Sequence, residues 1–156
     1  MNIFYVNRDP VLAAKDLPDK LIVKMPLETA QLLCTALNFF GEISEYKTTH
    51  LNHPSAIWTR KCKENFLWLG IHGLGLCQTY TQVYEKKHKC EQIIERCIGK
   101  LDALPDGVGP FHTDPPQCMP EQYRGNDTVE AYRKYMVAEK TRYAKWKNRE
   151  KPEWWK

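Results

Sequence analysis

The apolar positions of this chain recur mostly at intervals of three and four, the period of a helix with one buried face. Residues 27–40 carry such an apolar stripe: Leu27, Ala30, Leu33, Leu37 and Phe40. Residues 55–86 repeat the pattern, and Pro54 suits the first turn of a helix there. We therefore predict a helix over each segment. Three glycines in the second segment mark either points of close packing or a break: Gly70, Gly73 and Gly75.

The second half of the chain predicts two further helices separated by a loop. A shorter helix is expected over residues 90–101, and residues 104–120 must form a loop because they hold five of the ten prolines. A last helix is expected to begin at Asp127, with Glu130 placed as in a capping box. Its apolar side comprises Val129, Tyr132, Met136, Tyr143 and Trp146. Strand-like alternation occurs only in residues 2–6, so we predict an all-α fold.

Length and composition fit one globular domain over residues 1–156, since 42% of the residues are hydrophobic and 27% are charged. No apolar run approaches the length of a membrane span, and the first ten residues do not resemble a signal peptide. We therefore expect a cytoplasmic protein. Its six cysteines form no C-x-x-C pair, which favours reduced thiols. A metal site at His88, Cys90 and Cys97 lacks a recognised ligand spacing, so no metal is predicted.

Positive charge is concentrated at the end of the chain. Residues 133–156 contain nine Lys or Arg against three Asp or Glu, whereas residues 1–132 contain fourteen against sixteen. The last eleven residues, 146–156, also contain three tryptophans. Cations attract phosphates and aromatic rings stack on bases, so this composition is typical of a nucleic-acid-binding surface. A solvated helix face whose rings lie in the core explains the same composition equally well.

One candidate for catalysis is a polar stripe formed if the first predicted helix extends back through Pro26. Lys24, Glu28, Gln31 and Thr35 would then share one face. A carboxylate beside an amine suits the protonation and deprotonation of a glycosidic bond or an imine. The alternative, which the residues alone favour, places Pro26 in the first turn. Glu28 then only complements the helix N-terminus and Lys24 is a surface cation.

A second candidate is a phosphate site at the start of the helix predicted after Pro54. His50 and His53 precede this helix, and it carries three cations: Arg60, Lys61 and Lys63. A helix N-terminus attracts anions, so these residues could seat a phosphate. The alternative is that each histidine has a structural hydrogen-bonding role.

Four stretches, in this order, resemble the pyrimidine-dimer DNA glycosylase/AP lyase family of T-even phages. They are "LPDKLIVKMPLE" from residue 17, the basic helix beginning at His53, "MPEQYRGND" from residue 119 and "KPEWWK" from residue 151. The resemblance spans nearly the whole chain. It implies a compact helical domain that bends duplex DNA, holds a base out of the stack and cleaves the glycosidic bond at a damaged pyrimidine. This chemistry requires no cofactor.

Position by position, the family's catalytic acid corresponds to Glu28. In the family, the N-terminal α-amine attacks the sugar C1′ and forms an imine. Here residue 2 is Asn2, which is larger than the residues after which the initiator Met is usually removed, so the resemblance assigns the amine to Met1. The alternative is that the side-chain amine of Lys20 or Lys24 takes the place of the N-terminal amine. The family's histidine corresponds to Leu21, and its phosphate-binding arginines correspond to Leu27 and Gln31.

Together these observations predict a monomeric enzyme that binds double-stranded DNA, does not bind membranes and acts in DNA repair or modification. The predicted catalytic residues are Glu28, Lys24, Met1 and Asn2. The predicted DNA-binding residues are His53, Arg60, Lys61, Lys63, Arg124, Arg133, Lys147, Arg149, Trp154, Trp155 and Lys156, with both tail tryptophans beside the substrate base. Two alternatives remain: a transferase on the same scaffold that modifies a hypermodified pyrimidine, and a non-catalytic DNA-binding protein.

Overall fold

The computed structural model describes residues 1–156 and contains α-helices and short 3-10 helices but no strand, which confirms the all-α prediction. The helices are α1 (Pro10–Lys15), α2 (Asp19–Phe39), α3 (Pro54–Lys61), α4 (Lys63–Tyr84), α5 (Glu91–Ile98) and α6 (Thr128–Lys140). The 3-10 helices are η1 (Leu101–Ala103), η2 (Glu121–Tyr123) and η3 (Thr141–Tyr143). None of the helices is both long enough and apolar enough to cross a lipid bilayer.

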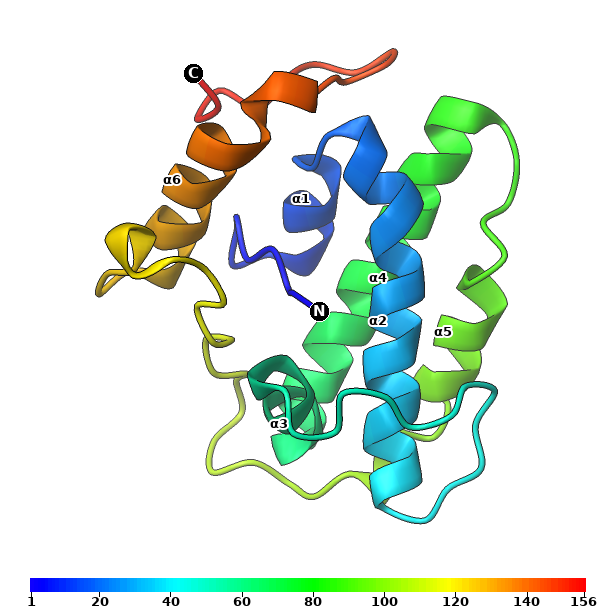
Figure 1. The fold of residues 1–156 in the computed structure, drawn as a ribbon. Helices are drawn as coiled ribbons and strands as arrows, with labels where there is room; N and C mark the ends of the chain where they lie inside the picture. The colour runs from blue at the N-terminus through cyan, green and yellow to red at the C-terminus, as the bar shows by residue number, and fades with distance from the viewer.

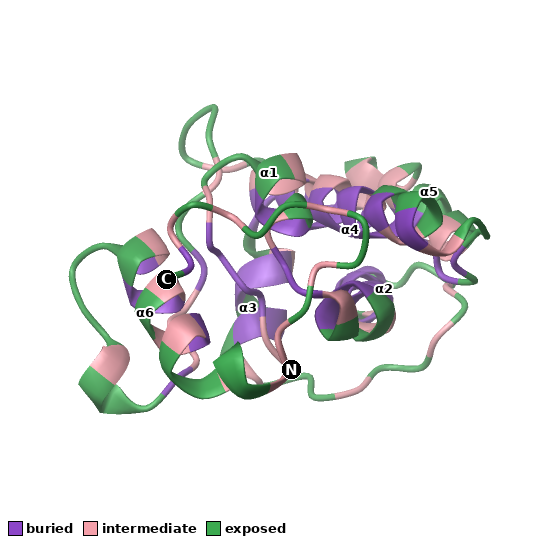
Figure 2. Cartoon of the chain, turned by 90° about the horizontal axis from the view of Figure 1, so that it is seen from above, coloured by how far each residue is buried: buried purple, intermediate pink, exposed green.

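Helix α4 is the centre of the fold and packs against α1, α2, α3 and α5 (Figure 1). It runs antiparallel to α2, with α5 alongside, whereas α6 lies on the opposite side of the N-terminal segment. Buried residues line the faces that these helices turn toward one another (Figure 2). The N-terminal segment therefore runs through the interior, between α6 and the α2–α4 layer.

The glycines of α4 allow this central position. A Cβ atom added at Gly70 would lie 2.7 Å from Ile98, and one added at Gly73 would lie 2.7 Å from Thr29. One added at Gly75 would meet Ala14 at 3.0 Å. The helix is continuous through all three, so they are points of close packing against α5, α2 and α1, not a break.

Residues 2–6, where the sequence shows strand-like alternation, form no strand. Four consecutive side chains are buried there, from Ile3 at 1% exposure to Val6 at 0%. Helices surround the segment on both sides, so its backbone has no neighbouring strand to pair with. Side chains bond to it instead, for example Arg133, whose Nε donates to the Val6 carbonyl at 2.9 Å.

Two predicted helix boundaries are wrong. Helix α2 begins eight residues earlier than expected, at Asp19, and continues through Pro26 because this first part is held by burial of Leu21, Ile22 and Met25. Tertiary packing thus compensates for the loss of the backbone hydrogen bond that Pro26 cannot donate. The helix predicted over residues 55–86 is interrupted at Cys62, which is extended. The buried Asn65 side chain donates to the Trp58 carbonyl at 3.0 Å and so satisfies the end of α3.

Other local predictions are confirmed. Asp127 caps α6 by accepting a hydrogen bond from the Glu130 amide at 3.0 Å, and Pro54 occupies the first turn of α3. All six cysteines are free thiols, with the Cys34 and Cys97 sulfurs 3.7 Å apart in the core. The predicted last helix is too long, however: α6 ends at Lys140, so Tyr143 lies in η3 and Trp146 in the tail. After η3 the tail turns back toward the α1–α2 junction (Figure 1).

Candidate active site

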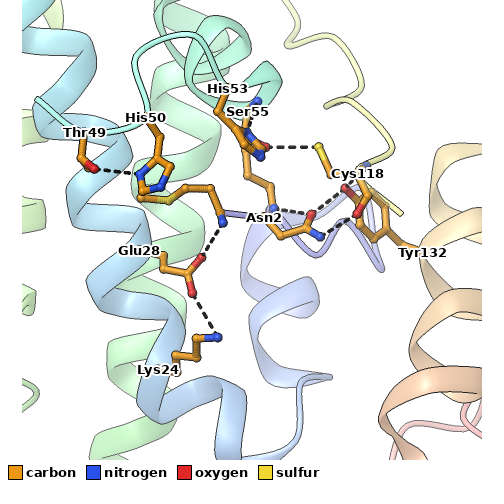
Figure 3. Close-up of polar contacts among 11 residues, drawn as sticks. Asn2, Lys24, Glu28, Thr49, His50, His53, Ser55, Cys118 and Tyr132 are labelled. Carbon is orange, nitrogen blue, oxygen red and sulfur yellow. Dashed lines mark hydrogen bonds and ion pairs between the residues drawn. The ribbon is translucent and has the colours of Figure 1, made fainter. Parts of the chain in front are cut away.

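The Glu28 carboxylate lies between two amino groups (Figure 3). Its Oε1 is 3.6 Å from the α-amino nitrogen of Met1, and its Oε2 is 3.5 Å from Nζ of Lys24. The Glu28 side chain is 16% exposed, whereas that of Lys24 is 65% exposed. The structure thus brings three of the predicted catalytic residues together, with the carboxylate largely shielded and one amine open to solvent.

This arrangement depends on the course of α2. Lys24 and Glu28 face each other because α2 is continuous through Pro26, and residues four apart lie one above the other on a helix. The alternative interpretation, in which Pro26 starts the helix and Glu28 complements its N-terminus, is therefore wrong. Thr35, further along the predicted polar stripe, is buried and exchanges hydrogen bonds with the backbone of Thr49. Its role is structural.

Asn2 positions the N-terminal segment instead of joining the amine–carboxylate group. Its Nδ2 donates to the Cys118 carbonyl at 2.9 Å, and its Oδ1 accepts from the Tyr132 hydroxyl at 2.8 Å. The same oxygen accepts from the Ile3 amide at 2.8 Å. These bonds tie residue 2 to α6 and to the loop before it (Figure 3). Asn2 is thus a positioning residue for the Met1 amine and not a catalytic residue.

His53 caps α3, which contradicts its prediction as a phosphate ligand. Its Nδ1 accepts a hydrogen bond from the Ser55 amide at 3.0 Å, so the ring occupies the position that an anion would take. Burial lowers the pKa of the His53 imidazole, as do the Met1 α-amino group and His50, while Glu28 acts in the opposite direction. A neutral ring agrees with its role as an acceptor. The structural alternative for this histidine is correct.

Two of the three cations that follow His53 are already bound within the protein. Arg60 donates to the Leu51 carbonyl at 2.7 Å and lies over the Phe39 ring. Lys63 lies 3.1 Å from Asp106 and 3.8 Å from Asp102, and these carboxylates raise its pKa. Only Lys61 is exposed without a carboxylate partner. The structure therefore does not bring these residues together as one phosphate site.

The tail tryptophans pack against the protein itself. Trp155 is 2% exposed, and its Nε1 donates to the Thr141 hydroxyl at 3.0 Å. Trp154 is half-buried and donates to the Asp16 carboxylate at 2.8 Å. Burial raises the pKa of the Asp16 carboxyl, with this hydrogen bond acting against the rise. Trp155 cannot stack on a substrate base in this arrangement, so the interpretation in which the rings lie in the core is correct for it.

The tail arginine is also structural. Arg149 is 12% exposed, forms an ion pair with Asp19 at 2.7 Å and donates to the Lys15 carbonyl at 3.0 Å. Asp19 lies nine residues before Glu28 on α2, a separation of roughly 13 Å at 1.5 Å per residue. The tail is therefore anchored about two and a half turns from the candidate catalytic group. The structure does not bring the tail tryptophans next to Glu28.

The remaining predicted cations divide into one structural residue and three exposed ones. Arg133 donates to the Val6 carbonyl, lies 3.6 Å from Glu130 and covers the Trp154 ring. Arg124 donates from Nε to the Met119 carbonyl but is exposed. Lys147 and Lys156 are exposed and form no ion pair. Of the predicted DNA-binding cations, those open to an external phosphate are thus Lys61, Arg124, Lys147 and Lys156.

Sequence reasoning missed one part of the site and a basic loop beside Lys24. Tyr132 was assigned to an apolar helix face, but its hydroxyl organises the N-terminus through Asn2 and the Pro116 carbonyl. The basic loop at residues 86–89 was not singled out, although three lysines in four positions are a visible signal. His88 in this loop is hydrogen-bonded to backbone on both ring nitrogens, and no group of three or more potential metal ligands is found.

Comparisons with protein-family models, with curated proteins and with solved structures found no match to this chain.

Proposed function

We propose that this protein is a duplex-DNA-binding enzyme of the pyrimidine-dimer glycosylase type, which cleaves the glycosidic bond of an extruded or damaged pyrimidine nucleotide. The observation that supports this most strongly is the position of Glu28 between two amino groups at 3.5 and 3.6 Å. Lys24 lies one turn away on the same helix, but the Met1 amine is 27 positions away in the chain. The Met1 amine therefore comes close to Glu28 only when the chain is folded.

The proposed reaction uses the amine as nucleophile and Glu28 as acid and base. A neutral amine attacks the sugar C1′, the C1′–N bond to the base breaks, and the departing base takes up a proton. The C1′–O4′ bond then breaks and O4′ takes up a proton, which opens the sugar ring and leaves the amine and C1′ joined as an imine. Glu28 is within reach to accept the proton that the amine must lose and to remove the C2′ proton that allows elimination of the 3′ phosphate. Shielding of the carboxylate strengthens its interaction with the charged imine.

Borohydride trapping tests this mechanism directly. Incubation with abasic duplex DNA and borohydride is expected to give a covalent protein–DNA adduct, because reduction converts the imine to a stable amine. Mass spectrometry of the digested adduct then identifies Met1 or Lys24 as the attached residue. Intact mass of the purified protein shows whether Met1 is present. Absence of an adduct, together with a requirement for a second small substrate, would instead indicate the transferase.

Duplex DNA binding is expected to depend strongly on salt. Among the predicted DNA-binding residues, four are exposed cations without a carboxylate partner: Lys61, Arg124, Lys147 and Lys156. If each neutralises one phosphate, the logarithm of the association constant falls with the logarithm of salt concentration at a slope of about −4 or steeper. Titration of labelled duplex at several salt concentrations measures this slope. A slope near zero would exclude nucleic acid as the partner.

A further inference from the structure

A basic hollow lies next to Lys24, on the side of α2 that faces the end of α4. Its volume is about 460 Å³. The chain segments that line it are α2 around Lys24, the end of α4 and the loop of residues 86–89. Four lysines belong to its lining, together with apolar and aromatic side chains on the α2 and α4 sides: Lys24, Lys86, Lys87, Lys89, Leu27 and Tyr80. None of the loop lysines belongs to the site described above.

His88 fastens the basic loop to α2. The ring is 8% exposed, and its Nδ1 accepts from the Cys90 amide at 3.1 Å, so Nε2 carries the proton and donates to the Val23 carbonyl at 3.0 Å. The Tyr80 ring packs edge-on against it at 4.8 Å. Glu85, the residue that ends α4, has a left-handed backbone with φ 57°, which costs about 1–2 kcal/mol for a non-glycine residue. The loop is thus held in a defined position at a cost in backbone energy.

The hollow has more positive charge than its neighbours neutralise. Lys24 is paired with Glu28, and Lys87 is paired with Glu91 at 3.1 Å. Lys86 and Lys89 are exposed and have no ion pair. A hollow that gathers four ammonium groups and leaves two without a partner is complementary to an anionic ligand, because like charges this close otherwise repel.

We propose that this hollow binds backbone phosphates of the DNA strand whose altered nucleotide lies at Glu28. This inference rests on the proposed function. Lys24 belongs to both sites, so a ligand in the hollow is separated from Glu28 by a single helical turn. Lysines bind phosphates as point charges and need no fixed orientation, while Leu27 and Tyr80 offer apolar area to the sugar. The loop thus supplies phosphate contacts close to Glu28, where the sequence has Leu27 and Gln31 in place of the family's arginines.

The test is the affinity for duplex DNA of the double variant Lys86→Ala/Lys89→Ala. A matched control is Lys47→Ala/Lys134→Ala, which removes the same charge from two exposed lysines, one in the loop between α2 and α3 and the other on α6. The probe is a labelled duplex that contains a tetrahydrofuran abasic analogue. Thermal unfolding of both variants checks that they remain folded.

The Lys86/Lys89 variant is expected to lose affinity by about 10-fold per lysine at 0.1 M salt, and its salt slope is expected to flatten by about two. The control is expected to retain the wild-type affinity and slope. Equal affinity of the two double variants, both folded, would overturn the proposal.

A second arm distinguishes the DNA backbone from a free phosphate compound. Inorganic pyrophosphate is titrated against the wild-type protein and the Lys86/Lys89 variant. Weak binding, with no difference between the two proteins, supports the backbone assignment. Tight binding that depends on Lys86 and Lys89, with DNA affinity unchanged by their loss, would overturn it in favour of a small phosphorylated ligand.

Failure of this inference is separable from failure of the proposed function. If wild-type protein forms the borohydride adduct but the loop variant binds DNA like the control, only the role of the loop is wrong. If wild-type protein neither binds DNA nor forms an adduct, the proposed function is wrong and the inference falls with it.

Discussion

Glu28→Gln is expected to lower turnover on abasic or damaged DNA by about 100- to 10,000-fold, the range that general acid–base groups contribute. The substitution keeps the shape of the side chain but removes the group that exchanges the proton. DNA affinity and the fold should change little. In the Lys24–Glu28 ion pair the lysine is exposed, and such pairs contribute only about 0–1 kcal/mol to the stability of the fold. Single-turnover kinetics at saturating protein, with thermal unfolding, measure the two effects separately.

Glu91→Gln is a closely matched control for this variant. Glu91 is 16% exposed, like Glu28, and pairs with Lys87, which lies four residues earlier in the loop before α5. Loss of this carboxylate should leave turnover unchanged. If Glu28→Gln retains activity and both variants lose the same stability, Glu28 has a structural role and the proposed chemistry is wrong.

Helical period and local chemistry were sufficient to predict most of the secondary structure. The stripe through Leu33 and Leu37 and the cap at Asp127 follow from signals within one element. The start of α2 does not, because Pro26 locally favours a helix start and only burial of Leu21 and Ile22 against the rest of the protein extends the helix. Tertiary contacts decided this boundary.

The candidate site was predictable only in part for the same reason. Glu28 follows from the resemblance, and its spacing to Lys24 follows from the sequence once the helix is continuous. The approach of the Met1 amine depends on the bonds of Asn2 to Tyr132 and Cys118, more than 110 residues away. No local pattern contains that information.

The aromatic tail shows where composition alone is ambiguous. Tryptophan beside lysine is equally consistent with a base-stacking surface and with rings that bury large apolar area. The partners that decide between them, Asp16 and Asp19, are partly buried and lie some 130 residues earlier in the chain. The positive charge of Arg149 is thus used within the fold, while that of Lys147 remains on the surface.

Trp155→Ala is expected to destabilise the protein by about 3–5 kcal/mol, the usual cost of truncating a buried aromatic residue. The ring is 2% exposed, packs at 4.9 Å against Trp146 and donates to Thr141, so its removal leaves a cavity and removes this hydrogen bond. For a chain of this length the loss corresponds to roughly 10 °C in melting temperature. Calorimetry or thermal unfolding by circular dichroism measures it. Lys156→Ala, at the exposed neighbouring position, should leave the melting temperature unchanged.

The same variants decide whether the tail contributes to base recognition. Because Trp155 is enclosed, Trp155→Ala should change the affinities for ordinary duplex and for duplex with an extruded base by the same factor, once both are measured well below the melting temperature. Trp154→Ala should cost less stability, since that ring is half-buried and part of its area is already exposed. A Trp155→Ala protein that melts like the wild type but selectively loses affinity for the extruded base would show that the tail opens to stack on DNA. Such a result would contradict a structural role for this ring.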